Sequence, residues 1–339
     1  MKPPRIAAIA VAVALLALGL AACGEKSEDV SGETQSLSLT LDFYPNPDHA
    51  GIYMAQKLGY FEEAGLDVSI NAPSDPAAPL QLVAAGRSDL AISYEPEVVL
   101  AHEQGLPITA VAAIVNRPLT SMIWLAKSGI KGVGDLKGKT VATAGIPYQD
   151  AFLKTILGRA NLTPADVKAV NVGFGLLPAL VGGSAQAMLG GYSNVEGVDL
   201  RERGKQPVVT PVDKLGVPIY DELVLVANSK KLEEEPEAIR LFIAALARGT
   251  AAAAERPNEA TEAILEANDA LEPKLTKAEV EATLPLLNPN VDPRQPFGYL
   301  NTEDWENFIG WMRDNELIEQ LPKASELLTN AYLPGEIPE

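Results

Sequence analysis

The sequence predicts an α/β protein with two lobes, and three observations support this prediction. Apolar strand-like segments alternate with helix-like segments from residue 37 to residue 230. A Gly/Lys-rich connection over 127–139 and a Pro/Gly-containing segment before residue 222 interrupt the alternation, and each could lead the chain between lobes. Beyond residue 233 the pattern is helical, so we expect C-terminal helices packed on the first lobe. The expected bounds are 37–126 and 222–339 for lobe 1, and 127–221 for lobe 2.

The first elements set the pattern for the rest of the chain. Residues 37–43, LSLTLDF, alternate apolar and polar side chains, which predicts a strand. Helical spacing over 51–65 and an apolar strand at 66–70 complete a strand–helix–strand unit, which is typical of a parallel sheet. The same reasoning predicts strands at 89–94, 108–115, 139–144, 167–172, 185–192 and 222–230. It predicts helices at 77–85, 96–104, 148–160, 176–181, 234–254, 257–269, 276–286 and 302–316.

The N-terminal segment predicts export and lipidation. Residues 1–22 combine Lys2 and Arg5 with an apolar core too short for a comfortable bilayer span, as in a signal peptide. The core ends in LAAC, which resembles a bacterial lipobox with Cys23 as the lipidated residue. Residues 23–36 are polar and predict a flexible tether. We therefore expect a protein on the extracytoplasmic face of the membrane, held there only by its lipid anchor.

Composition excludes several classes of protein. A net charge of −18 argues against a nucleic-acid partner, which would need a basic face. Cys23 is the only cysteine, so a disulfide framework and a thiolate metal site are excluded from the mature body. The two histidines, His49 and His102, lie in no metal-ligand spacing, and no nucleotide-binding or hydrolase motif occurs. We expect a monomer without metal or cofactor that is not an enzyme.

The candidate site follows from one rule: ligands of open α/β lobes lie beyond the carboxyl ends of the strands. Twelve side chains in segments following predicted strands meet that rule and have suitable chemistry. They are Asp42, Phe43, Asn46, His49, Tyr94, Glu95, Thr120, Ser121, Tyr148, Tyr192, Asn194 and Glu196. Tyrosines, amides and carboxylates favour a neutral or weakly basic heteroaromatic ligand, whereas an oxyanion would call for basic groups.

Several of these residues also have a purely structural interpretation. Asn46 and His49 could be turn and helix-capping residues. Glu95 could simply suit the positive end of a helix dipole. In GGYSNVEG the period-two spacing of Tyr192 and the following Asn and Glu would place three side chains on one side of an extended chain. The alternative for that stretch is an ordinary turn.

Five segments resemble a known family in their order along the chain. They are LDFYPNPDHAGIYMAQKLGYFEEAGLDVSI at 41–70, GRSDLAISYEPEVV at 86–99, NRPLTSMIWL at 116–125, DLKGKTVATAGIP at 135–147 and AQAMLGGYSNVEG at 185–197. Together they resemble the ThiY-like, SsuA-related binding proteins for pyrimidine precursors of thiamine, over about residues 37 to 250.

The resemblance implies a type II periplasmic-binding-protein fold, in which each lobe is a mixed sheet flanked by helices and the lobes close about a two-stranded hinge. It also implies capture of hydroxymethylpyrimidine or formylaminopyrimidine and delivery to the transmembrane subunits of an ABC permease. Relatives on the same scaffold take riboflavin precursors, alkanesulfonates or related organic acids, so these ligands stay open. Related hydroxymethylpyrimidine synthases have a cysteine-rich run before the strand at 222–230, which is absent here. A non-transport surface lipoprotein also remains an alternative.

Overall fold

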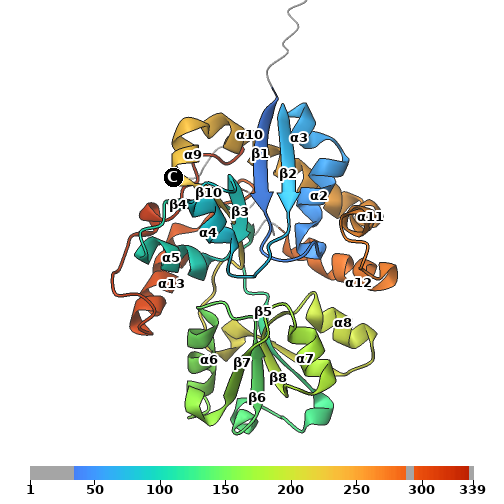
Figure 1. The fold of residues 1–339 in the computed structure, drawn as a ribbon, viewed down its shortest axis with the longest axis vertical. Helices are drawn as coiled ribbons and strands as arrows, with labels where there is room; N and C mark the ends of the chain where they lie inside the picture. Colours follow the sequence, from blue (N-terminus) through green and yellow to red (C-terminus); the bar gives the residue numbers. More distant parts are fainter. Residues whose placement is uncertain (1–33, 288–293, 336–339) are drawn as a thin grey trace, which may run out of the picture. The chain divides into compact units, whose positions relative to one another are not determined.

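The structure is a computed structural model that describes residues 34–287 and 294–335 (Figure 1). The predicted signal segment 1–22, the predicted lipidation site Cys23 and most of the predicted tether lie outside the described residues. The described chain forms two five-stranded mixed sheets flanked by helices, with strand orders β2-β1-β3-β10-β4 and β7-β6-β8-β5-β9. The expected α/β fold with two mixed sheets is confirmed, and we call each sheet with its helices a lobe.

Lobe 1 begins immediately after the predicted tether. Its strands are β1 (Gln35–Thr40), β2 (Leu66–Asn71), β3 (Leu90–Ser93), β4 (Ile108–Val115) and β10 (Leu223–Asn228). β1 pairs in parallel with β2 and β3, whereas β10 runs antiparallel to β3 and β4. Leu37, Leu39 and Leu41 are buried as their alternation predicts, which fixes the register of β1 against the core. The start of β1 at Gln35 shortens the predicted tether by two residues.

Helices of lobe 1 come from both ends of the chain. Those before β10 are η1 (Pro47–His49), α2 (Ala50–Lys57), α3 (Tyr60–Glu63), α4 (Pro79–Ala84) and α5 (Glu95–Glu103). Those after it are α9 (Ser229–Glu234), α10 (Pro236–Glu255), α11 (Pro257–Ala267), α12 (Pro273–Thr283), η6 (Leu284–Leu286), α13 (Thr302–Asp314) and η7 (Ala324–Glu326). α10 and α11 pack on α2, so the C-terminal helices do lie on lobe 1 (Figure 1). The helix predicted over 51–65 is divided at Gly59, whose φ of 72° breaks the helical path.

Glycines permit the close contact between α10 and α2. A Cβ on Gly249 would lie 2.2 Å from the carbonyl oxygen of Gly51, and a Cβ on Gly51 would lie 2.2 Å from the Thr250 hydroxyl. Neither position has room for a side chain, so the two helices approach backbone to backbone. This contact attaches the C-terminal helices to the first βα unit.

Lobe 2 is formed by the residues between the two points at which the chain passes from one sheet to the other, and it is green to yellow-green in Figure 1. Its strands are β5 (Thr120–Leu125), β6 (Thr140–Thr143), β7 (Lys168–Asn171), β8 (Ala187–Tyr192) and β9 (Pro207–Pro211). Its helices are η2 (Ala126–Ser128), η3 (Val133–Leu136), α6 (Gln149–Gly158), η4 (Pro164–Asp166), α7 (Leu176–Gly182), α8 (Glu196–Glu202) and η5 (Val212–Leu215). β6 pairs in parallel with β7 and β8, and β5 runs antiparallel to β8 and β9.

Sheet membership corrects the predicted boundary between the lobes. β5 belongs to the second sheet, so the chain enters lobe 2 before Thr120 and not at residue 127. All six residues of β5 are buried, and without polar alternation the strand was not predicted. The short elements β9, α8 and α9 were not predicted either. The return to lobe 1 lies between η5 and β10, as the Pro/Gly segment indicated.

One buried carboxylate joins the two segments in which the chain passes between the lobes. Glu222 accepts hydrogen bonds from the backbone N–H groups of Leu119 and Thr120 at 2.7 and 2.8 Å. It also accepts from the hydroxyls of Thr120 and Tyr220 at 2.8 and 2.9 Å. Burial raises the pKa of Glu222, although these four donors stabilise its charged form. The outgoing and returning strands are therefore attached to each other at the hinge.

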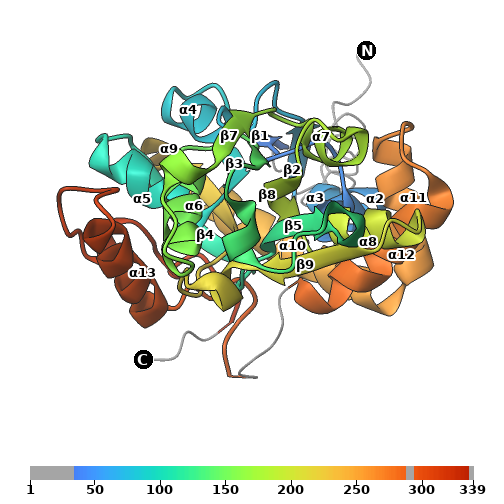
Figure 2. The same cartoon turned by 90° about the horizontal axis from the view of Figure 1, so that it is seen from below.

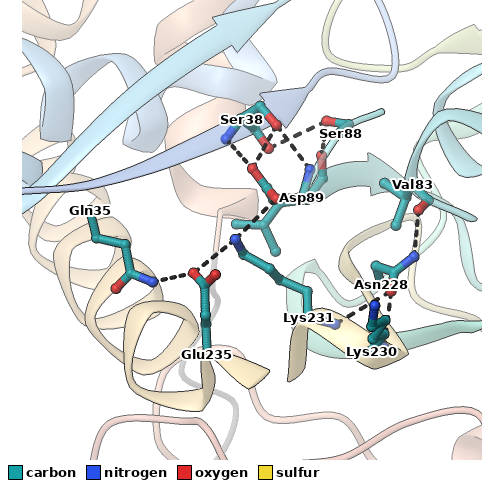
Figure 3. A network of polar contacts seen from close by, with 10 residues as sticks. Gln35, Ser38, Val83, Ser88, Asp89, Asn228, Lys230, Lys231 and Glu235 are labelled. Carbon is teal, nitrogen blue, oxygen red and sulfur yellow. Dashed lines mark hydrogen bonds and ion pairs between the residues drawn. The ribbon is translucent and has the colours of Figure 1, made fainter. Parts of the chain in front are cut away.

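A network of polar contacts connects elements of lobe 1 near the start of β1 (Figure 3). The Lys231 ammonium contacts Asp89 at 3.3 Å and Glu235 at 2.8 Å, and Gln35 donates to Glu235. Asp89 also accepts hydrogen bonds from the Ser38 N–H and hydroxyl at 2.8 and 2.7 Å. Burial alone would raise the pKa of Asp89, but these donors and Lys231 hold it below its ordinary value. The network attaches β1 and the β3 entry to α9.

Candidate ligand-binding site

A cavity of about 320 Å³ lies between the two lobes, where carboxyl ends of parallel strands from both sheets meet. Segments following β1 and β3 line it from lobe 1, and segments following β6 and β8 line it from lobe 2. This is the position that the strand-end rule gives for an open α/β protein. The volume lies at the lower end of the range for small-molecule sites.

Eight of the twelve candidate residues line this cavity. They are Asp42, Phe43, Asn46, Tyr94, Thr120, Tyr148, Tyr192 and Glu196. The other four, His49, Glu95, Ser121 and Asn194, lie outside the lining and bond to protein groups. Contact of any of these residues with a ligand remains a prediction.

Aromatic rings line the cavity on both lobes. Tyr94 of lobe 1 and Tyr148 of lobe 2 approach edge to face, with ring centroids 5.8 Å apart. Phe174 of lobe 2 contacts the rings of Phe43 and Tyr44 at centroid distances of 4.4 and 4.5 Å. The rings of the two lobes thus contact one another edge to face, and Phe43, Tyr44, Tyr94 and Tyr148 give the cavity an aromatic wall.

Asp42 is held in place by its neighbours at the cavity wall. Its Oδ2 accepts from the Tyr94 hydroxyl at 2.9 Å, and its Oδ1 lies 2.8 Å from His49 Nε2. His49 Nδ1 accepts the backbone N–H of Asn46 at 3.3 Å, so Nε2 carries the hydrogen that Asp42 receives. Asn46 caps η1 by accepting the N–H of Asp48 at 2.8 Å. The capping interpretation is therefore correct for Asn46, which faces the cavity as well. His49 completes the capping box of η1 but forms no side-chain cap bond to the following helix α2.

The stretch GGYSNVEG is a turn, and the expectation of an extended trio on one side of a strand was wrong. β8 ends at Tyr192, and Glu196 begins α8 after three intervening residues. Glu196 Oε2 accepts the Tyr192 N–H at 2.7 Å, which closes the turn. Tyr192 and Glu196 still line the cavity, but Asn194 is directed elsewhere.

Asn194 joins lobe 2 to lobe 1. Its side-chain amide donates to Asp48 Oδ1 and to the Thr283 hydroxyl, both at 2.8 Å. Asp48 Oδ2 and Asn194 Oδ1 are buried and have no hydrogen-bond partner in the part of the chain that the structure describes. Burial, and then the nearby carboxylates Asp42 and Glu196, raise the pKa of Asp48 well above its ordinary value, so this acid resists ionisation.

Glu95 and Ser121 support the hinge and do not line the cavity. The Glu95 carboxylate accepts the backbone N–H of Asp221 at 2.7 Å, and Trp305 donates to the Asp221 carboxylate at 2.7 Å. Burial raises the pKa of both acids, that of Asp221 to about 7. The Ser121 hydroxyl donates to the Leu119 carbonyl at 2.9 Å. These side chains follow strands, as expected, but they point into protein.

An acidic wall between α8 and α12 was not predicted. The two helices lie side by side (Figure 2) and give the cavity Asp199 and Arg203 from α8, and Glu272, Thr276 and Glu279 from α12. Arg203 forms a two-point ion pair with Asp199, one contact of which measures 2.9 Å. The strand-end rule could not find α12, since this helix reaches the cavity from the C-terminal part of the chain.

Gln149, Leu176 and Ile146 add amide and apolar groups to the cavity lining. Within residues 34–287 and 294–335, no cluster of three or more His, Cys, Asp or Glu side chains could hold a metal ion. Over the same ranges, no helix combines the length and the apolarity that a membrane span requires.

The two sheets with the cavity between them have the architecture of the periplasmic-binding-protein fold. Two alkanesulfonate-binding SsuA proteins share this fold. That of Xanthomonas axonopodis pv. citri has a TM-score of 0.69 at 14% identity, covering 88% of this chain and 99% of its own. That of Escherichia coli has a TM-score of 0.68 at 15% identity, covering 90% and 96%.

The chain belongs to the NMT1/THI5-like family, whose model matches residues 46–260. It is 36% identical to a formylaminopyrimidine-binding protein of Halalkalibacterium halodurans over 97% of this chain and 99% of the relative. It is also 36% identical to a Haemophilus influenzae protein named for thiamine biosynthesis, over 86% and 90%. A 4-amino-5-hydroxymethyl-2-methylpyrimidine phosphate synthase of Legionella pneumophila is 26% identical over 88% and 92%. The family indicated by the sequence segments is confirmed.

Proposed function

We propose that this protein captures a thiamine-precursor pyrimidine, hydroxymethylpyrimidine or formylaminopyrimidine, and delivers it to the transmembrane subunits of an ABC importer. The cavity supports this proposal most strongly, because its lining includes Phe43 and tyrosines from both lobes, which suit a flat ring. Acid and amide groups at Asp42, Glu196 and Gln149 supply acceptors for an aminopyrimidine. The formylaminopyrimidine-binding relative, alike over nearly the whole chain, supports the ligand class.

Lobe closure is the proposed capture step. The cavity is formed by both lobes, and the Asn194 hydrogen bonds to Asp48 and Thr283 exist only when the lobes are together. Hinge closure of this kind encloses the ligand and changes the surface that a permease meets.

A synthase function is the second candidate, favoured by the relatives that carry that name. We place it behind binding for two reasons. The relatives with the greater identity include a binding protein, and the segment before β10 contains no cysteine, unlike that of the synthases that the sequence resembles. An alkanesulfonate ligand is less suited to this cavity, because its single lining arginine, Arg203, is already paired with Asp199.

We further propose that Cys23 is lipidated and holds the protein on the extracytoplasmic face of the membrane. The lipobox-like LAAC sequence supports this, and so does the compact body that begins at Gln35, a short distance after it. Cys23→Ser should move the protein from the membrane fraction to the soluble fraction. Equal membrane association of the variant would refute the anchor.

A thermal-shift panel tests the ligand class. The purified protein is heated with hydroxymethylpyrimidine, formylaminopyrimidine, thiamine, riboflavin or an alkanesulfonate. A ligand that binds only the folded state at one hundred times its Kd adds about 2.7 kcal/mol of stability, which raises Tm by several degrees. We expect this shift for a pyrimidine. A shift with the sulfonate or riboflavin alone would transfer the assignment to that ligand.

A further inference from the structure

Glu279 is a buried carboxylate that the fold leaves without a partner. Its side chain lines the cavity from α12 and only 4% of the residue is exposed. No hydrogen bond or ion pair joins it to any other residue within the described ranges. The carboxylate oxygens of Glu279 are accessible from the cavity, so a donor or a cation on a bound ligand can reach them, while burial of the side chain disfavours the charged form.

The groups around Glu279 compensate it only in part. In α8, Glu196 accepts the Tyr192 N–H, and Asp199 pairs with Arg203 at the C-terminal end of that helix. From η1, Asp48 faces the same region and adds another acid. The charge of Arg203 lowers the pKa of Glu279, but this effect is smaller than the opposite effects of Asp199, Glu196 and Asp48, and the guanidinium is paired with Asp199.

The remaining elements packed on α12 add no free positive charge. The glutamates of α11 lie in exposed pairs, Glu262 and Glu266 with Lys57 and Glu259 with Arg256. η6 is Leu-Pro-Leu, and Glu272 of α12 itself is a further acid on the cavity wall. The cavity thus has an electronegative end with one unpaired acceptor.

We infer that Glu279 is a specificity-determining residue that receives a protonated amine on the ligand, an inference that rests on the proposed pyrimidine-binding function. Among pyrimidines with the same ring, the cavity should prefer one whose side arm ends in an ammonium over one that ends in a hydroxyl. The hydroxyl and amine forms differ by a single heavy atom, so the comparison isolates the charge.

Binding of the amine should release a proton from the protein. Burial, followed by the charges of Asp199, Glu196 and Asp48, raises the pKa of Glu279 to about 8. At pH 7 the free protein therefore holds a mostly neutral Glu279. An ammonium placed beside it stabilises the carboxylate, and about one proton passes from Glu279 to the buffer for each ligand bound.

Titration calorimetry of the purified protein at pH 7 tests this inference. The ligands are 4-amino-5-hydroxymethyl-2-methylpyrimidine and its 5-aminomethyl analogue, each in two buffers with different heats of ionisation. We expect the amine to bind at least tenfold more tightly and to release about one proton, and the alcohol to release none. Glu279→Gln should abolish both the preference for the amine and the proton release.

Controls separate this inference from the proposed function. Glu281→Gln changes an exposed acid on the same helix and should preserve the amine preference. A thermal melt of Glu279→Gln should show undiminished stability, because the change removes a buried unpaired acid. Binding of the alcohol without preference for the amine, or with preference unchanged in Glu279→Gln, overturns the Glu279 assignment alone. Failure of both pyrimidines to bind overturns the proposed function and this inference with it.

Discussion

The hydrogen bonds of Asn194 offer a direct test of lobe closure. Asn194→Ala removes the amide that donates to Asp48 and Thr283 across the lobes. Neither bond belongs to the core of one lobe, so the change should act on closure more than on folding. The Asn194 side chain is buried where it meets Asp48 and Thr283 of lobe 1.

The expected size of the effect follows from two bonds. A hydrogen bond contributes about 1 kcal/mol net, so the closed form should lose about 2 kcal/mol. If the lobes of the free protein are mainly apart, the whole loss appears in the free energy of ligand binding, and Kd rises by about 30-fold.

A matched control uses another asparagine with bonds inside lobe 1. Asn228 donates to the Val83 carbonyl at 2.8 Å and accepts the Lys230 N–H at 3.0 Å (Figure 3). Asn228→Ala should lower Tm and leave Kd unchanged, whereas Asn194→Ala should weaken Kd with little change in the Tm of the free protein. Calorimetric Kd values and thermal melts of both variants, with the pyrimidine that binds the wild type, measure the contrast. Unchanged affinity in a folded Asn194→Ala protein would refute the role of this contact in closure.

Three further predictions concern stability. Glu222→Ala strands four buried donors at the hinge and should lower the free energy of unfolding by about 3 kcal/mol or more in denaturant titrations; a loss below 1 kcal/mol would contradict the hinge role. Burial raises the pKa of Glu97 to about 7, so the folded state retains a proton that unfolded glutamate loses near pH 4. The contribution of Glu97 to the free energy of unfolding is therefore complete below about pH 4 and declines by up to about 3 kcal/mol as the pH rises through 7. The free energy of unfolding, measured at pH 5 and pH 8, should fall less between these two values in Glu97→Gln than in the wild type. An equal decline in that variant would exclude Glu97 as the source. Gly249→Ala forces a Cβ into the backbone of α2 and should cost several kcal/mol, whereas Gly310→Ala, in an open position on α13, should stabilise by about 0.5–1 kcal/mol; equal melting temperatures would contradict the packing argument.

Periodic patterns in the sequence were sufficient for most of the fold. The strand predicted at 108–115 coincides with β4, and the start and end of α10 differ from the predicted helix by only one or two residues. β4 is a continuous run of mostly apolar residues after Pro107, and α10 begins at a proline. β5 was missed because this short strand begins with the polar residues Thr120 and Ser121, so its sequence shows neither alternation nor a long apolar run. Because β5 was missed, the predicted boundary between the lobes was placed after this strand instead of before it.

The strand-end rule identified part of the cavity but not its acidic wall. Tyr94, Tyr148 and Tyr192 could be found because each follows or ends a strand or begins a helix. Glu279 could not, since it lies in the middle of a helix more than eighty residues after Glu196, and an isolated glutamate in a helix usually indicates a solvated face. Only the packing of α12 against α8 turns it toward the cavity.

The turn at GGYSNVEG shows a limit of periodicity arguments. Period-two spacing was wrong about the backbone, although Tyr192 and Glu196 both line the cavity. Glu196 accepts the Tyr192 N–H, and this local bond outweighs continued extension. The turn frees Asn194 to reach across to lobe 1.

Titration of the purified protein with formylaminopyrimidine tests the central claim most directly. We predict a one-to-one complex with a Kd of about 1 μM or tighter, equivalent to about −8 kcal/mol. A substitution that fills the cavity, Leu176→Trp, should abolish the binding heat without unfolding the protein. Absence of binding by both formylaminopyrimidine and hydroxymethylpyrimidine, with tight binding of an alkanesulfonate, would contradict the account.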